Sequence, residues 1–268
     1  MAPTIVAPDA RYRPVTLAEP APHGYLYVAA SVAPPVGPPF PVPNARRSAL
    51  LSRLKALAAD LEGSPSVVRA TVFQGVLLPP PSTVLESLPA GAIPGVTPSP
   101  PSDPGPVPAA AGPFRADVVV LVTAASPSAL PGVRDSPAFR SLIDAVGAAA
   151  PGAFRVVAAR CAKRIADVEP SPRGVFIFNH FTTEDPAPGL ALWDHVAGWY
   201  AKETGLANSL VMVPLEPAPW AFVNHARWDC GLGTLARRQF AKASFRTFVL
   251  ANLRAGGIVA SPALYRLA

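Results

Sequence analysis

The clearest pattern of hydrophobic and polar positions begins at Gly174 and runs to the end of the chain. The β-rich run VFIFNHF is followed by a segment in which Trp193, Val196, Ala197 and Tyr200 recur at helical spacing, and Gly205 marks its end. The predicted elements are strand 174–181, helix 190–204, strands 209–216 and 221–228, helix 234–254, and a short edge strand in the terminal SPALYRLA. The predicted order is therefore β-α-β-β-α-β.

The first part of the chain predicts the same order of elements, although few residues are identical between the two parts. Ser136-Pro137 is a good cap and first-turn pair for a helix. The predicted elements are strand 24–31, helix 46–63, strands 67–78 and 116–125, helix 136–150, and a strand beginning at 154.

This order is the split βαβ, or ferredoxin-like, motif, in which an antiparallel sheet carries both helices on one face. We therefore expect an α+β fold with two tandem modules, residues 1–170 and 171–268, whose sheets pack together as a single-chain pseudo-dimeric α/β barrel. A proline-rich insertion occupies about 79–113 of the first module and contains twelve prolines. Because proline donates no backbone hydrogen bond, residues 80–113 are predicted to form an exposed, dispensable loop.

Composition narrows the class of protein. Half of the residues are hydrophobic, 15% are charged, and the net charge is +6. Arg238, Lys242 and Arg246 share one helical stripe, which we interpret as a solvated face because no nucleic-acid-binding module accompanies it. No run is apolar enough to span a bilayer, and the start of the chain lacks a secretory apolar region. We expect a cytoplasmic protein with no nucleic-acid or membrane partner.

Few metal or cofactor motifs are present. Cys161 and Cys230 fit neither a metal spacing nor a disulfide framework. The run GLGTLA at 231–236 comes after a strand and precedes a helix, but no acidic residue occurs after Asp229, so a dinucleotide site is rejected. His180 and His225 lack a third ligand for a metal site, so the expectation is no metal.

Two Asn-His pairs interrupt apolar strands, Asn179-His180 and Asn224-His225. Strand residues alternate between faces, and the first and third strands of this motif are neighbours. Asn179, Asn224 and Trp228 are therefore expected on the helix side of the sheet. His180, His225 and Arg227 are expected on the side facing the partner sheet.

Each of these residues has a plain structural interpretation as well. Buried asparagine and histidine are usually satisfied within a core. Trp193 and Tyr200 could line a pocket or belong to an ordinary helix core. Because two polar pairs lie on adjacent central strands, two interpretations are about equally favoured: a polar floor in an apolar cavity, or satisfied core residues. Which face of the sheet holds the pocket is left open.

The third strand of the second module, with the sequence AFVNHARWD before a helix, resembles the dimeric α/β-barrel superfamily, and the resemblance covers mainly residues 174–268. That group includes antibiotic-biosynthesis monooxygenases, stress-responsive Dabb proteins, polyketide cyclases and haem-degrading monooxygenases. In its quinone-forming, cofactor-independent members an Asn and a Trp four residues apart line the substrate pocket, and Asn224 and Trp228 have this spacing.

The resemblance implies an enzyme of secondary metabolism that acts on an aromatic or polyketide-like small molecule, by cofactor-independent oxygenation or by ring closure. Asn179 and Asn224 would then hold a phenol or enolate oxygen, and His180 or His225 would act as general base. Trp228, Arg227, Trp193 and Tyr200 would bind substrate. The alternatives are a non-catalytic ligand-binding or stress-associated protein, or a haem protein that binds haem through either histidine. A further homodimer is left open.

Overall fold

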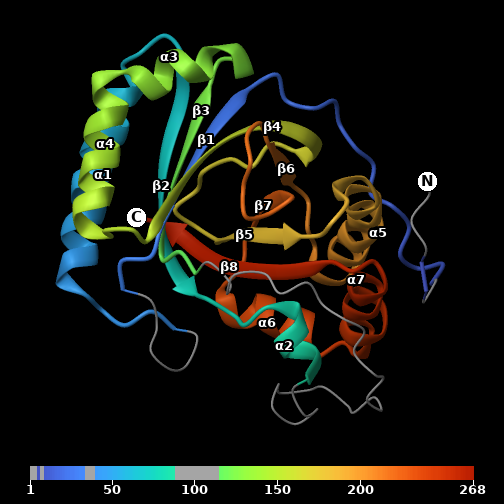
Figure 1. Ribbon diagram of the computed structural model, residues 1–268. Helices are drawn as coiled ribbons and strands as arrows, with labels where there is room; N and C mark the ends of the chain where they lie inside the picture. Colours follow the sequence, from blue (N-terminus) through green and yellow to red (C-terminus); the bar gives the residue numbers. More distant parts are fainter. Residues whose placement is uncertain (1–4, 7–8, 34–39, 88–114) are drawn as a thin grey trace.

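The computed structural model describes residues 5–6, 9–33, 40–87 and 115–268, and in it eight strands close into a barrel. All neighbouring strands are antiparallel, in the order β1-β3-β2-β8-β5-β7-β6-β4 (Figure 1). The strands are β1 Gly24–Ala30, β2 Val67–Leu77, β3 Val118–Ala124, β4 Phe154–Ala166, β5 Val175–Thr182, β6 Ser209–Pro214, β7 Phe222–Trp228 and β8 Val259–Leu267.

The strand order confirms the predicted fold class. The first four strands lie in the order β4-β1-β3-β2 and the last four in the order β8-β5-β7-β6, which is the ferredoxin-like arrangement twice. The two sheets join edge to edge, because β2 pairs with β8 and β4 pairs with β6. The prediction that the terminal strand is a sheet edge is wrong: β8 also pairs with β5, and closure of the barrel leaves it no free edge. The boundary between residues 170 and 171 stays a prediction.

The helices form two groups, on opposite outer faces of the barrel. In Figure 1, α1 and α4 cover the strands β1–β3, while α5, α6 and α7 lie beside β5–β8. The helical segments are α1 Ala45–Glu62, α2 Ser82–Ser87, η1 Pro127–Ala129, α3 Leu130–Asp135, α4 Pro137–Ala149, α5 Pro186–Thr204, α6 Leu232–Phe240, η2 Phe245–Leu250 and α7 Ala251–Ala255.

Local signals explain where the longer helices start and stop. The side chains of Asn44, Ser136 and Asp185 each accept a hydrogen bond from a backbone N–H in the first turn of α1, α4 and α5. Helix α5 ends at Gly205, whose φ of 77° lies in the left-handed region that glycine tolerates best. The stop predicted at Gly205 is confirmed.

The single helix predicted over 234–254 is wrong. The chain forms α6, leaves the helix after Phe240, and resumes as the π-helical η2 before α7. Residues five positions apart on a regular α-helix point roughly 140° apart. The break instead lets Phe240 and Phe245 pack edge to face, with ring centroids 5.3 Å apart, and both rings line the same pocket.

The proline-rich insertion departs from prediction in its described part. Residues 82–87 form helix α2, which packs against the second half of the molecule rather than lying exposed. The Ser82 hydroxyl accepts a hydrogen bond from the backbone N–H of Ala260 on β8, at 3.1 Å, and Leu85 is buried. The remainder of the predicted loop, residues 88–113, lies outside the described residues.

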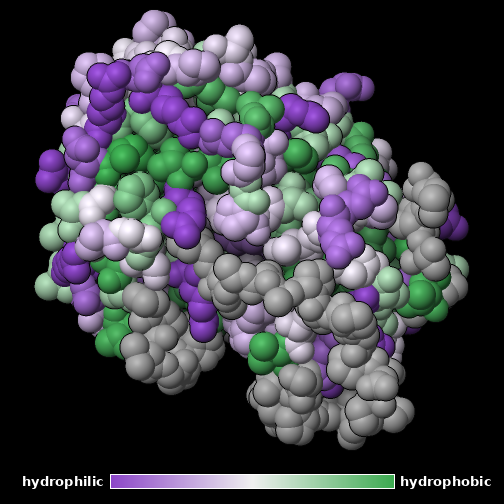
Figure 2. Space-filling view, in the orientation of Figure 1, coloured by the Kyte–Doolittle hydropathy of each residue, from purple (hydrophilic) through white to green (hydrophobic). Residues whose placement is uncertain are grey.

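Polar and apolar residues are mixed on the face of the molecule that Figure 2 shows. Hydrophilic residues gather over α3 and the upper part of α4. Within the described ranges, no helix combines the length and the hydropathy that crossing a membrane requires.

Candidate functional site

The two Asn-His pairs lie side by side at the centre of the second sheet. Strand β5 pairs with β7 so that Asn179 is directly opposite Asn224. Alternation then puts both asparagines on the helix side, while His180 and His225 point into the barrel among its aromatic residues. The neighbouring positions and the two faces follow the prediction.

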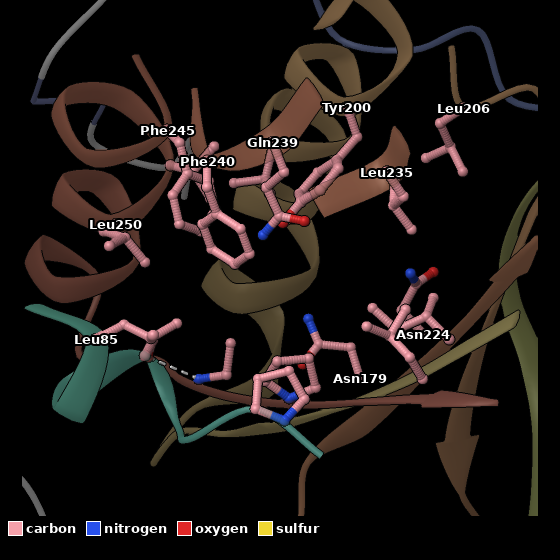
Figure 3. A pocket seen from close by; sticks show the side chains of 18 of the residues that line it. Leu85, Asn179, Tyr200, Leu206, Asn224, Leu235, Gln239, Phe240, Phe245 and Leu250 are labelled. Atoms are coloured by element: carbon pink, nitrogen blue, oxygen red, sulfur yellow. Dashed lines mark hydrogen bonds between the residues drawn. The ribbon is translucent and has the colours of Figure 1, made fainter. Parts of the chain in front are cut away.

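A pocket lies between this sheet and the helices of the second half, with α2 at its rim (Figure 3). It holds about 970 Å³ of empty space, counting its opening to solvent. The polar side chains in the lining are Ser82, Asn179, Tyr200, Asn224 and Gln239, joined by the indole groups of Trp193 and Trp228. Aliphatic and aromatic residues make up the rest, so the pocket suits a mostly apolar molecule.

The amide of Asn224 is held in one orientation by its neighbour on β6. The hydroxyl of the fully buried Ser209 donates a hydrogen bond to Asn224 Oδ1. With its oxygen engaged, the amide has its Nδ2 group left to donate into the pocket.

The amide of Asn179 is less satisfied than that of Asn224. Its Oδ1 is buried, and no hydrogen-bond partner for it exists among the residues that the structure describes. In Figure 3 the nitrogen of Asn179 points toward the centre of the pocket, where Gln239 and Tyr200 approach from the helices. Two amides therefore present N–H donors to one apolar space.

The aromatic residues predicted to bind substrate form one wall of this pocket. Trp228 Nε1 donates to Thr204 Oγ1 at 2.9 Å, which fixes the indole plane. The ring centroids of Trp228 and Tyr200 are 6.2 Å apart, and Trp193 lines the pocket from α5. Burial raises the pKa of Tyr200, so its phenol stays protonated at neutral pH.

The sequence interpretation missed several lining residues. Gln239 sits on the apolar stripe of α6 with Leu232, Leu235 and Ala236, and a polar residue on such a stripe is a usable signal. Ser82 and Leu85 gave no comparable signal, because they lie in a segment whose proline content predicts a loop.

The predicted general base does not fit this pocket. Neither His180 nor His225 is part of its lining, and among the described residues Tyr200 is its one titratable group. The reason is the period-two alternation itself, since an Asn-His dipeptide in a strand must point its two side chains to opposite faces. A histidine acting on a substrate held by the asparagines would have to reach through the sheet.

Both histidines are instead buried inside the barrel. His180 Nε2 lies 2.9 Å from the Tyr27 hydroxyl, and His225 Nδ1 lies 3.1 Å from the Ile177 carbonyl oxygen. The His225 ring stacks on Phe178 with centroids 4.2 Å apart. Burial lowers the pKa of each histidine from 6.5 to about 4, so both rings are neutral at pH 7.

The prediction that Arg227 binds substrate does not fit either. Its guanidinium donates to the Glu169 carbonyl oxygen at 2.6 Å and pairs with Asp229 at 3.1 Å. Arg227 therefore ties the end of β7 to the segment that joins the two halves, on the side of the sheet away from the pocket.

The pocket on the helix side does not fit a haem or a metal ion. In the described ranges, no group of three His, Cys, Asp or Glu side chains could hold a metal. No histidine, cysteine or methionine lines the pocket on the helix side. Inside the barrel, both ring nitrogens of His180 already face protein oxygens, from Tyr27 and Ser261.

Comparison with known proteins supports the fold. No protein-family model matches the chain, and no curated protein matches its sequence. A solved structure of an anthrone oxidase-like protein superposes with a TM-score of 0.60 at 13% identity, covering 95% of this chain and 94% of that one. A protein of Fusobacterium nucleatum subsp. nucleatum assigned as a monooxygenase gives a TM-score of 0.55 at 7% identity, covering 93% and 94%. At these identities the likeness shows the fold alone, the dimeric α/β barrel that the sequence predicts.

Proposed function

We propose that the pocket between β5, β7 and the second group of helices binds a flat aromatic ketone or phenol and oxygenates it without a cofactor. The observation that carries this proposal is the pair of amides, Asn179 and Asn224, which are directly opposite each other on neighbouring strands and line one mostly apolar pocket. An aromatic ligand would pack between Trp228, Tyr200 and the helix side chains, and its oxygen would accept from the two amides.

Hydrogen bonds to a developing oxyanion are worth most where water is excluded. The amides would stabilise the enolate or phenolate of the ligand and so lower the ligand's own pKa. Since Tyr200 is protonated at neutral pH, the proton would leave to solvent rather than to an ionised side chain. Dioxygen would then oxidise an activated CH₂ group to a carbonyl, with one oxygen atom kept in the product and the other released as water.

The similarity to the anthrone oxidase-like structure suggests the probe. Anthrone has an aromatic ketone opposite an acidic CH₂ group, which is the chemistry described above. Ring closure through the same enolate, and ligand binding without chemistry, are the competing functions. The first would leave dioxygen unconsumed while converting a polyketide-type chain, and the second would give binding with no turnover.

The test is to add anthrone in aerated buffer while following dioxygen uptake and quinone absorbance, and to measure binding by quenching of tryptophan fluorescence. We expect saturable binding, and Asn224→Ala should lower activity or affinity at least about tenfold through the loss of a hydrogen bond to a charged oxygen. The matched control is Asn44→Ala, which removes an amide at the start of α1, far from the pocket, and should leave binding unchanged. Absence of saturable binding, or equal effects of the two substitutions, would contradict the proposal.

A further inference from the structure

A second cavity lies inside the barrel, on the other side of the sheet from the pocket. It holds about 950 Å³ of empty space, counting its opening to solvent. Strands from both halves line it, with Tyr25 on β1, Thr71 on β2 and His225 on β7. The segments 21–23 and 167–170 form its rim. The mouth of a β-barrel is a common position for a small-molecule site.

The most buried polar group of this cavity is His225. The residue is 3% exposed, and its Nδ1 faces the Ile177 carbonyl oxygen, which can only accept. The neutral ring therefore carries its proton on Nδ1, and Nε2 is left as an acceptor. Among the described residues, the hydrogen bond of the His225 ring is made through Nδ1. Because His225 lines the cavity, Nε2 can accept a hydrogen bond from a donor in that space.

Several other polar side chains line this cavity. His23 Nδ1 is buried and unpaired within the described residues. Tyr25 presents its hydroxyl from β1, and burial raises its pKa so that this group remains a donor. Thr71 and Thr123 add hydroxyls from β2 and β3. The cavity thus offers donors and acceptors around a space that opens to solvent.

The floor and the rim narrow the class of ligand. Phe73 and Phe176 meet edge to face at the floor, with ring centroids 5.2 Å apart, which suits an aromatic ring. At the rim, Arg69 pairs with Glu169 and Arg164 pairs with Asp167, so each cation is already matched by a carboxylate. A neutral ligand therefore fits better than an anion.

We infer that the barrel mouth is a second binding site, separate from the pocket, for a small neutral hydroxylated aromatic whose hydroxyl donates to Nε2 of His225. The ring would pack on Phe73 and Phe176, and Tyr25 would donate to the ligand oxygen. Because Asn224 and His225 are consecutive on β7, one strand would serve the two sites on its two faces. This inference stands whether or not the pocket carries out oxygenation.

The experiment is a calorimetric titration of phenol into the full chain. Wild type should bind phenol saturably. His225→Phe keeps a flat ring that can stack on Phe178, and it should weaken binding at least tenfold. Tyr25→Phe removes only a hydroxyl, and it should weaken binding severalfold. The matched control is Tyr12→Phe, which also removes a buried phenolic hydroxyl but lines neither the pocket nor this cavity, and it should leave phenol affinity unchanged.

Three outcomes would overturn the inference. Phenol binding that survives both His225→Phe and Tyr25→Phe would place the ligand elsewhere, and an equal loss of affinity in Tyr12→Phe would show a general structural effect instead of a contact with the ligand. Lack of any saturable binding would mean that the cavity holds only water. Circular dichroism checks that each variant is folded, and Tyr25→Phe alone decides the matter if His225→Phe does not fold.

Discussion

The two halves of the molecule place the same strands under the same kind of helices, yet their helix-facing surfaces differ. In the first half, Val28 on β1 is opposite Val120 on β3, and both are buried in the core under α1 and α4. Asn179 is the fifth residue of β5, as Val28 is of β1. Asn224 is the third residue of β7, as Val120 is of β3. One half thus has a packed apolar core where the other has a polar floor beneath a pocket.

The helices above these surfaces differ in the same way. In the first half α1 and α4 are continuous over 18 and 13 residues and pack fully on the sheet. In the second half α5 is continuous, but its partner is broken into α6, η2 and α7 around the pocket. A sheet that carries two amides cannot be sealed by leucine and valine without leaving buried polar groups unpaired, so the cavity and the asparagines go together.

The largest effect of a single substitution is expected when the first half receives the polar residue that the second half has at the equivalent position. Val120→Asn should lower the free energy of unfolding by roughly 3–4 kcal/mol, because it buries an amide without a partner in a packed core. Val120→Ala, which removes packing alone, should cost roughly 1 kcal/mol less. Urea denaturation measures both, and an asparagine variant as stable as the alanine variant would remove the basis of the comparison.

The next largest effect concerns pH, since His180 and His225 occupy strand positions that hold Ala29 and Leu121 in the first half. The pKa of each histidine is lowered from 6.5 to about 4, so the unfolded chain takes up protons below pH 6.5 while the folded chain does not. Stability should therefore be fully present above pH 6.5 and decrease as the pH falls toward 4, by up to roughly 3 kcal/mol per histidine.

Urea denaturation at pH 7, 5.5 and 4.5 measures this dependence. His225→Phe should reduce the slope of stability against pH by about half over that range. Comparison of the variant with wild type cancels the contribution of carboxylates that titrate in the same interval. Equal slopes in the two proteins would show that His225 is not held neutral by burial.

A smaller effect on stability is expected from substituting the glycine that follows the first helix of each half, Gly63 after α1 and Gly205 after α5. Gly205 after α5 has φ 77°, whereas Gly63 after α1 has φ −67°, a conformation open to any residue. Gly205→Ala should cost about 1 kcal/mol, and Gly63→Ala should cost clearly less. Thermal melting of the two variants side by side measures the difference, and equal shifts would mean that backbone conformation is not the cause.

The smallest effect on stability is expected from the reverse exchange, Asn179→Val. Because Asn179 Oδ1 has no partner within the described residues, its removal leaves no new unpaired group, and the free energy of unfolding should change by less than about 1 kcal/mol. Affinity for an aromatic ligand of the pocket should nevertheless fall severalfold. A large loss of stability would show that Asn179 is a structural core residue and not part of a binding floor.

Much of the site follows from local regularities of the sequence. Period-two alternation assigns Asn224 and Trp228 to one face of β7 and His225 to the other, and the order of elements makes β5 and β7 neighbours. Gly205 and Ser136 mark helix ends through backbone and capping preferences that act within a few residues. Such signals need no knowledge of the rest of the chain.

Tertiary structure alone decided what closes around these residues. Ser82 of the first half's insertion bonds to Ala260, 178 positions away, and brings α2 onto the pocket of the second half. The pairing of β2 with β8 and the contact of His225 Nδ1 with the Ile177 carbonyl oxygen likewise depend on contacts between distant parts of the chain. Alternation and capping are set by neighbours within one turn or strand, whereas a cavity is set by which distant side chains fail to fill a space.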